Sequence, residues 1–170
     1  MIAITTVASA IGPLTIAARD EHVCLLHFGP ADAGPRAWLQ RWYPSEPVGE
    51  AGDPGGAVTA LSRYFAGELD ALALLTLELN GTPFQKRVWE ALRAVQGGTT
   101  ATYAALARAI GAPTSVRAVG AANGANPIAL VVPCHRIIGS NGTLTGYGGG
   151  LERKRWLLEH EGCRLTFFQL

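Results

Sequence analysis

The stretch YAALARAIGAPTSVRAVGAAN, residues 103–123, contains the pattern that decides the fold of the second half of the chain. Its first part predicts a helix over Tyr103–Ile110, which Gly111 stops, and a tight turn follows at Pro113. A second helix is expected over about Ser115–Asn123. Helix, short glycine-containing turn and second helix is the helix-turn-helix pattern, although many other helical hairpins share it.

The second of these helices has an unusual composition. It consists almost entirely of Ala, Gly and Asn, and each glycine inside a helix costs about 1 kcal/mol relative to alanine. Close packing in a core would explain the small residues but not Arg117, which has no acidic residue near it in the sequence. A smooth helix with one long cation fits a surface pressed against DNA, where the arginine enters the base stack or holds phosphate.

Upstream, a change in composition at Asn80-Gly81 predicts a domain boundary, with one domain over residues 1–80 and another over 81–170. Thr82 is expected to cap a helix over about Pro83–Val95, since proline is favoured at the first helical position. The first half predicts a small antiparallel sheet plus helices. The expected strands are Ile2–Val7, Leu14–Ala18, Val23–Phe28 and Leu75–Leu79, the expected helices are Ala37–Tyr43 and Ala57–Phe65, and residues 49–56 are expected to form a flexible connector.

Charge is distributed unevenly between the two halves. The net charge is +1, but residues 1–80 carry four basic and nine acidic side chains, whereas residues 81–170 carry ten basic and four acidic ones. Between Glu90 and Glu152 there is no acidic residue, while Arg93, Arg108, Arg117 and Arg136 all lie there. A solvated basic face would explain a modest imbalance, but the pattern also favours a polyanionic partner, with nucleic acid the leading candidate.

Length, cysteine usage and the first residues limit the class of protein. A chain of 170 residues can bury a substantial core, and no apolar run reaches membrane-spanning length. The start predicts a strand and not a signal peptide. Three cysteines without a CxxC pair indicate a reducing cytoplasm. His22, Cys24 and His27 lie close together, but a strand would point the two histidines to opposite faces, so we expect no metal site.

The segment VVPCHRII, residues 131–138, places a thiol next to an imidazole between apolar runs. We expect Pro133 to break a strand and expose Cys134 at an edge or pocket. A nearby imidazole can bring thiolate into the neutral pH range, although extended backbone would point Cys134 and His135 to opposite sides, so a kink or a bridging water is needed. Glu161, at the carboxyl end of a predicted helix over Leu151–His160, is the candidate carboxylate for fixing the histidine tautomer.

Five motifs together resemble the 6-O-alkylguanine-DNA alkyltransferases, the methylated-DNA–protein-cysteine methyltransferases. They are GTPFQKRVWEAL, TYAALA, RAVGAANGANP, VVPCHRIIG and GYGGGLERKRWLLEHEG, in family order across roughly residues 81–162. The resemblance implies a ribonuclease H-like α/β first domain and a mostly helical, winged-helix-like second domain with the helix-turn-helix. It implies irreversible, single-turnover transfer of the alkyl group from 6-O-alkylguanine, and also from 4-O-alkylthymine, with base flipping and no cofactor or metal.

The resemblance also implies roles for individual residues. Cys134 matches the alkyl acceptor, His135 the base acting on the thiol through water, and Glu161 the orienting carboxylate. The remaining matches are Asn126 beside the cysteine loop, Tyr103 as the proton donor to guanine, Arg117 as the finger that fills the stack, Gln85 and Ser140 at the DNA backbone, and Tyr147, Gly148 and Val132 in the base pocket. The expected partner is double-stranded DNA carrying alkylated bases, without a membrane, bound by a protein that is monomeric in solution.

Two departures from the family pattern and three alternative functions remain. The segment QGGTTATY lacks the acidic turn residue often found before the tyrosine, so the lead-in to Tyr103 differs. Ala129 and Gly148 are small at pocket positions, which predicts room for groups larger than methyl, a point that relative rates on benzyl and methyl adducts test. A cysteine hydrolase, a non-catalytic sensor of damaged DNA and a plain helix-turn-helix transcription factor are the alternatives, and cooperative binding to DNA stays open.

Overall fold

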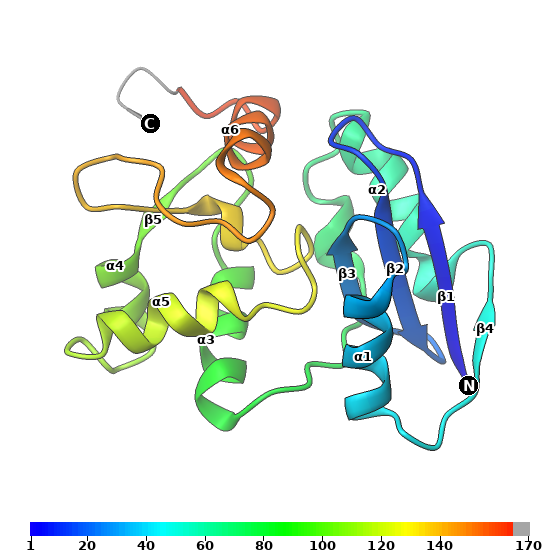
Figure 1. Ribbon diagram of the computed structural model, residues 1–170. Helices are drawn as coiled ribbons and strands as arrows, with labels where there is room; N and C mark the ends of the chain where they lie inside the picture. Colours follow the sequence, from blue (N-terminus) through cyan, green and yellow to red (C-terminus); the bar gives the residue numbers. More distant parts are fainter. Residues whose placement is uncertain (165–170) are drawn as a thin grey trace. The chain divides into compact units, whose positions relative to one another are not determined.

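The computed structural model describes residues 1–164 (Figure 1). The chain divides into two compact units. The first comprises Met1–Asn80 together with Pro127–Val131, and the second comprises Gly81–Asn126 and the chain from Val132 onward. The short stretch 127–131 therefore leaves the second unit and joins the first, immediately before the cysteine of interest.

A four-stranded sheet forms the centre of the first unit, in the order β3-β2-β1-β4. The strands are β1 (Ile2–Val7), β2 (Leu14–Arg19), β3 (His22–Phe28) and β4 (Val48–Glu50). The expected antiparallel meander of the first three strands is confirmed. The prediction of a flexible connector over residues 49–56 is wrong at its start, because β4 overlaps it. Strand β4 pairs parallel with β1, so the sheet is mixed and not purely antiparallel.

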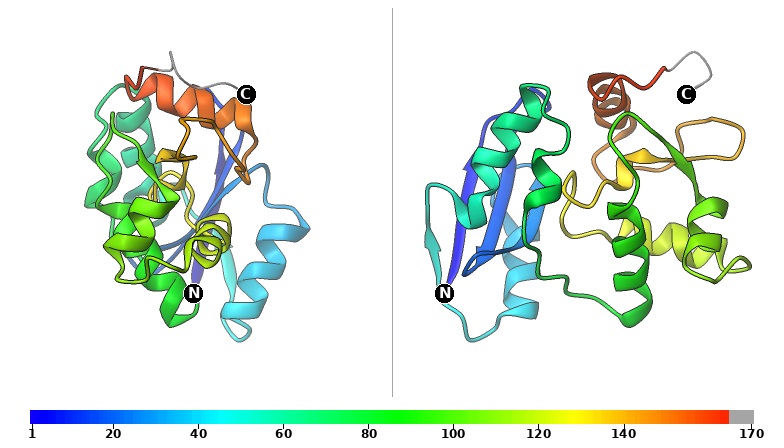
Figure 2. Two further views of the ribbon diagram at one scale, coloured as in Figure 1. Left: turned by 90° about the vertical axis from the view of Figure 1, so that its left-hand side faces the viewer. Right: turned by 180° about the vertical axis from the view of Figure 1, so that it is seen from behind.

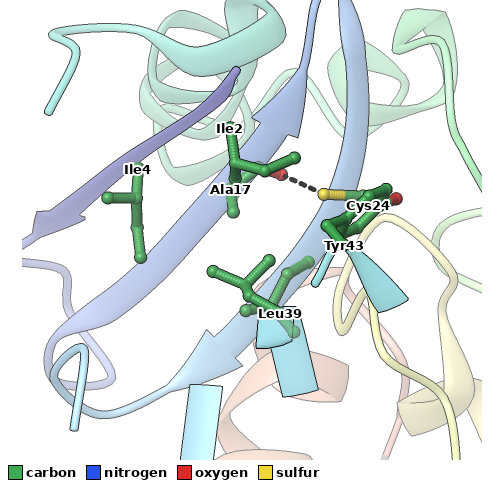
Figure 3. Packing of buried hydrophobic residues seen from close by; sticks show 7 residues of the cluster. Ile2, Ile4, Ala17, Cys24, Leu39 and Tyr43 are labelled. Atoms are coloured by element: carbon green, nitrogen blue, oxygen red, sulfur yellow. Dashed lines mark hydrogen bonds between the residues drawn. The ribbon is translucent and has the colours of Figure 1, made fainter. Parts of the chain in front are cut away.

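Helices α1 (Ala33–Trp42) and α2 (Ala57–Phe65) cover opposite faces of this sheet (Figures 1 and 2). Short 3-10 turns, η1 (Pro54–Gly56) and η2 (Ala71–Leu74), flank α2. Asp32 caps α1 by accepting a hydrogen bond from the Gly34 amide, so the helix begins four residues before its predicted start. Figure 3 shows α1 packed on the sheet through Leu39 and Tyr43.

Two other segments of the first unit contact β3. The strand expected over Leu75–Leu79 is wrong, because only a single bridge joins Leu77 to Val23. The second segment is 127–131, which lies far along the sequence. The Leu26 amide donates to the Pro127 carbonyl (3.0 Å), and the Ala129 amide donates to the Leu26 carbonyl (3.0 Å). Ile128, fully buried, is thereby fixed in the core of the first unit.

The second unit is mostly helical. Its elements are α3 (Pro83–Arg93), β5 (Ala101–Thr102), α4 (Tyr103–Ala109), α5 (Val116–Gly124), η3 (Cys134–Arg136), β6 (Ile137–Ile138) and α6 (Leu151–His160). The predicted cap of α3 is confirmed as a full capping box, in which Thr82 and Gln85 each accept the other's backbone N–H. Gly111, with φ of +71°, ends α4 as expected.

The parallel pair of β5 and β6 brings two distant parts of the second unit together. Ala101 lies opposite Ile137, and Thr102 lies opposite Ile138. Thr102 also caps α4 through its hydroxyl, so the lead-in to Tyr103 is a strand that pairs with the residues directly following the cysteine turn. Among residues 1–164, no helix combines the length and apolarity needed to cross a membrane.

Candidate functional site

Cys134 begins the 3-10 turn η3 and is buried, with only 7% of its surface exposed. The expectation of an exposed cysteine at a broken strand is therefore wrong. Residues 129–132 form turns and not a strand, because the Val131 amide bonds the Ala129 carbonyl and the Cys134 amide bonds the Val132 carbonyl, at 2.8 Å each. Pro133, with no N–H to donate, precedes the turn and allows the chain to reverse tightly around the thiol.

Asn126 holds this turn in place. Its Nδ2 donates to the Val132 carbonyl at 2.7 Å and contacts Cys134 Sγ at 3.1 Å. Asn126 is the last residue before the stretch that joins the first unit, and Val132 is the first residue after it. The Asn126 side-chain amide therefore joins the two ends of the excursion, the stretch 127–131 that leaves the second unit, and also orients the Cys134 sulfur.

His135, Glu161 and Arg136 form a buried hydrogen-bonded group. His135 Nε2 lies 2.8 Å from Glu161 Oε1, and both side chains are fully buried. Arg136 donates to the same carboxylate through Nε and Nη2, at 2.9 Å each, and its Nη1 donates to the Val95 carbonyl at 2.6 Å. Glu161 caps the carboxyl end of α6, where the helix dipole disfavours an anion, and these three bonds offset that penalty.

The shifted pKa values define the resting protonation of this group. Burial favours neutral Glu161, but the bonds from His135 and Arg136 hold its pKa well below the usual range. Burial lowers the pKa of His135 despite the adjacent carboxylate, and it raises the pKa of Cys134 against the opposing bond from Asn126. The resting site thus contains a neutral thiol, a neutral imidazole and a charged Arg136–Glu161 pair.

The tautomer of His135 follows from this arrangement. A carboxylate can only accept, so Nε2 carries the proton and donates it to Glu161. Nδ1 is left with its lone pair, and within residues 1–164 this buried nitrogen has no hydrogen-bond partner. The imidazole is therefore set to receive a proton at Nδ1.

Helix α5 buries one side and exposes another. Val119 and Ala122 are buried, and the Ala122 carbonyl accepts from Trp89 Nε1 at 2.8 Å. Arg117, Ala121 and Gly124, spaced to share one helix face, are exposed. The small residues therefore allow close packing on the buried face, and on the exposed face Arg117 is a long cation among small side chains.

The other residues singled out from the sequence lie around this unit in different environments. Tyr103 begins α4, and its hydroxyl lies 3.5 Å from the Thr145 carbonyl. Gln85 uses its side-chain oxygen in the α3 capping box, and Ser140 is exposed. In the proposed pocket, Val132 is fully buried, Tyr147 is partly buried and Gly148 is exposed. Ala129, expected at the pocket wall, belongs to the stretch that joins the first unit.

Comparisons with known proteins agree along the whole chain. Residues 83–163 match the DNA binding domain of 6-O-methylguanine DNA methyltransferase, and residues 2–79 match its ribonuclease-like domain. The chain belongs to this family. The methylated-DNA–protein-cysteine methyltransferase of Mycobacterium tuberculosis (strain H37Rv) is 47% identical over 175 residues, covering 99% of each chain.

Two further relatives extend this finding. The methylated-DNA–protein-cysteine methyltransferase of Salmonella typhimurium is 58% identical over 115 residues, which cover 68% of this chain and 67% of that protein. The crystal structure of Mycobacterium tuberculosis OGT in complex with DNA superposes with a TM-score of 0.76 at 44% identity, covering 94% of this chain and 93% of that one. The two-domain architecture of the methyltransferase family is therefore established for this chain.

Two residues of this methyltransferase-family site were missed or misread in the sequence. Arg136 was grouped with the cations that face a polyanion, but it is 7% exposed and neutralises Glu161. Lys154 was not singled out, yet it is completely buried on α6 and donates to two backbone carbonyls. The absence of acidic residues around Arg136 in the sequence was a usable signal, since an arginine that is buried there must take its partner from far along the chain. Within residues 1–164, no cluster of His, Cys, Asp and Glu has the makeup of a metal site.

Proposed function

We propose that this chain repairs DNA directly by moving an alkyl group from 6-O-alkylguanine onto Cys134. The observation that carries the proposal is the arrangement of Asn126, Cys134, His135 and Glu161 in a chain of this family. The Cys134 sulfur is held by Asn126, and the next residue, His135, is locked by Glu161 with its Nδ1 available to take a proton.

The transfer is a displacement at carbon. The Cys134 sulfur, having passed its proton through one water to His135 Nδ1, attacks the alkyl carbon on guanine O6. A sulfur–carbon bond forms as the carbon–oxygen bond breaks, and the electron pair stays on the purine. The Tyr103 hydroxyl donates a proton to the leaving guanine, and the proton held by His135 restores the tyrosine. The balanced outcome is a thioether and unmodified guanine.

The fixed carboxylate is what suits His135 to this task. Glu161 accepts from Nε2 and stabilises the imidazolium that forms during attack, while Arg136 keeps the carboxylate ionised. The resting thiol is neutral, so the sulfur becomes a strong nucleophile only when the proton can leave. This arrangement protects a buried cysteine between encounters with damaged DNA.

Access to the damaged base requires its extrusion from the duplex, at a cost of a few kcal/mol that a damaged pair reduces. The exposed face of α5 carries only small residues apart from Arg117, so the backbone of that helix can approach DNA closely. Arg117 then fills the gap in the stack. Gln85, through its amide NH2, and Ser140 bind the DNA backbone, and Tyr147, Gly148 and Val132 surround the flipped base.

The remaining features of the proposal follow from the family. Residues 81–170, apart from the stretch 127–131 that joins the first unit, form the alkyltransferase and DNA-binding domain with winged-helix-like architecture, and residues 1–80 form the ribonuclease H-like domain. Each molecule acts once, because the thioether that forms is a stable bond. The reaction needs no cofactor. The substrates also include 4-O-alkylthymine, and the protein acts as a monomer in a reducing compartment.

Intact mass spectrometry tests this function. The wild-type protein is mixed with excess duplex carrying one 6-O-methylguanine, and its mass is followed together with peptide mapping. The expected result is the gain of one CH2 on the Cys134 peptide and no further turnover, with Cys134→Ser binding the duplex but gaining nothing. An unchanged wild-type mass with retained binding would indicate a damage sensor, and one without binding would favour a cysteine hydrolase.

A further inference from the structure

The carboxyl end of α5 has an irregular hydrogen-bond pattern that the proposed mechanism leaves unexplained. In a continuing α-helix the Asn126 amide would donate to the Ala122 carbonyl, four residues before it. The Asn126 amide donates instead to the Asn123 carbonyl, at 3.4 Å, and the Ala122 carbonyl accepts from the Trp89 indole at 2.8 Å. A side chain of α3 therefore occupies the acceptor that would keep Asn126 in the helix.

This change of partners matters because Asn126 is the residue that holds the reactive sulfur. Released from the helical pattern, Asn126 reaches the Val132 carbonyl (2.7 Å) and Cys134 Sγ (3.1 Å) through its Nδ2. A continuous series of hydrogen bonds and covalent neighbours thus runs from the Trp89 indole, through the end of α5, to the sulfur.

The proline that follows Asn126 does not by itself account for this geometry. Pro127 disfavours helical backbone at the residue before it, so the chain leaves the helix after Asn126. It does not supply a donor to the Ala122 carbonyl. Because this carbonyl is buried, leaving it without a partner would cost free energy, and the indole N–H of Trp89 removes that cost.

The orientation of the Trp89 ring is constrained by the start of the second unit. Trp89 is 1% exposed, and the backbone of Gly81 lies directly against its ring. A Cβ added at Gly81 would lie 2.5 Å from two ring carbons, so only glycine permits this approach. The backbone at residue 81 therefore closes one side of the ring and helps to hold the indole N–H toward α5.

We propose that Trp89 is a positioning residue for alkyl transfer, whose indole N–H takes the Ala122 carbonyl from the helical pattern and thereby places Asn126 where its amide holds Cys134. The inference rests on the proposed function and deepens it, because it extends the machinery around the sulfur to α3. Gly81 acts one step earlier by seating the ring. Trp89 is buried and acts through Asn126, without contact with the DNA.

Single-turnover transfer at saturating 6-O-methylguanine duplex, measured together with duplex affinity, tests the inference. Trp89→Phe keeps an aromatic ring and removes the N–H donor. The Asn126 amide then returns to the buried Ala122 carbonyl and draws its side chain from the sulfur, so we expect transfer about tenfold slower. The affinity for the duplex stays unchanged. Trp38→Phe makes the same chemical change in the first unit and leaves both quantities near the wild-type values.

A double-mutant cycle separates positioning from general stability. Asn126→Ala removes the amide through which Trp89 acts, so adding Trp89→Phe to it should slow transfer no further. Rates are compared at a temperature where urea unfolding shows every variant to be folded. The NMR resonances of the Asn126 side-chain amide provide a second readout that needs no DNA, and they should shift in Trp89→Phe but not in Trp38→Phe.

A second substitution moves the ring without changing it, and it replaces Trp89→Phe if that variant does not fold. The methyl group added in Gly81→Ala displaces the Trp89 ring, so it should slow transfer and shift the Asn126 resonances in the same direction. Its control is Gly52→Ala in the first unit, where an added methyl meets nothing within 4 Å.

The outcomes distinguish this inference from the proposed function. A wild-type protein that gains no methyl group would overturn the proposed function, while shifted Asn126 resonances in Trp89→Phe would still support the link from α3. A wild type that transfers normally, with Trp89→Phe equally fast, would overturn the inference. Full additivity of Trp89→Phe and Asn126→Ala would do the same, as would Asn126 resonances that Trp89→Phe leaves in place.

Discussion

At the scale of single residues, the site is organised around a carboxylate that lies at an unfavourable helix end. Glu161 is tolerated there because His135 and Arg136 supply three hydrogen bonds to its two oxygens. Removing one member of such a buried pair leaves the other charge without compensation, which costs more than the pair contributes in total. If Glu161 lost its charge, Arg136 would be the buried cation without a compensating anion.

The variant Glu161→Gln tests this account. We expect the free energy of unfolding in urea to fall by about 3 kcal/mol, because the Arg136 guanidinium is left buried and unpaired. Alkyl transfer slows as well, since an amide does not stabilise the imidazolium of His135. The matched control is Glu159→Gln, an exposed glutamate on the same helix, for which both quantities stay near the wild-type values.

The same variant has a defined pH dependence. The pKa of Glu161 is lower in the folded than in the unfolded state, so its charge stabilises the fold above the unfolded value of about 4.3. That contribution is lost as the pH falls through the folded pKa. The stability difference between the wild type and Glu161→Gln should therefore shrink on acidification below about pH 4, and a difference independent of pH would contradict the assignment.

At the scale of elements, one side of α5 packs inside the second unit and the other side, around Arg117, is exposed. Its buried side touches α3 through the Trp89–Ala122 hydrogen bond, and Gly120 lies near the ring of Tyr103, where an added methyl would sit 3.9–4.0 Å from ring carbons. Its other side, around Arg117, carries no large apolar group. Substitutions on the two sides should therefore have opposite consequences.

A pair of variants on α5 makes this measurable. Ala121→Leu places bulk beside Arg117 and is expected to weaken duplex binding about tenfold or more while changing stability little, because the new side chain points to solvent. Gly120→Ala, at a half-buried position between the two sides, meets only ordinary contacts with the Tyr103 ring, so it is expected to stabilise the helix by up to about 1 kcal/mol and to leave DNA affinity unchanged. Equal affinities for both variants would remove the exposed face of α5 from the DNA interface.

Elements with local signals could be predicted from the sequence, and those without could not. Thr82, Pro83 and Gln85 fix the start of α3 through adjacent residues, and Gly111 ends α4 through its own backbone. In contrast, β4 is a strand of three residues that pairs with β1 through its backbone. A strand this short is not long enough to show an alternation of apolar and polar residues in the sequence. The turns before Cys134 were also missed, since the apolar residues of 128–132 are buried in turns as well as they would be in a strand.

The chemistry of the site was predictable in part for the same reason. The contact of His135 with Glu161 was expected and is confirmed, because a base needs an orienting partner and few acids were available. The bonds from Arg136 to Glu161 span 25 residues of sequence, and the two carbonyls bound by Lys154 have no side-chain signature. Tertiary contacts of backbone groups leave no pattern in the sequence.

At the scale of the whole molecule, the chain itself connects the first unit to the site. Residues 127–131 leave the second unit, pack with β3 through Ile128, and return at Val132, two residues before the cysteine. Asn126 and Val132, at the two ends of this excursion, are joined by a hydrogen bond of 2.7 Å. The core of the first unit therefore anchors the stretch that precedes the reactive sulfur.

This anchoring predicts that one core residue of the first unit matters for transfer in a way that its neighbours do not. Ile128→Ala and Leu39→Ala both empty a buried position of the first unit, and each should lower the free energy of unfolding by about 2–5 kcal/mol. Only Ile128→Ala should also slow single-turnover transfer, measured at a temperature where both variants are folded, because it alone loosens the stretch between Asn126 and Val132. Comparable slowing by Leu39→Ala would mean that general stability, and not this anchor, limits the reaction, since Leu39 packs from α1 in the core cluster of Ile2, Ile4 and Tyr43.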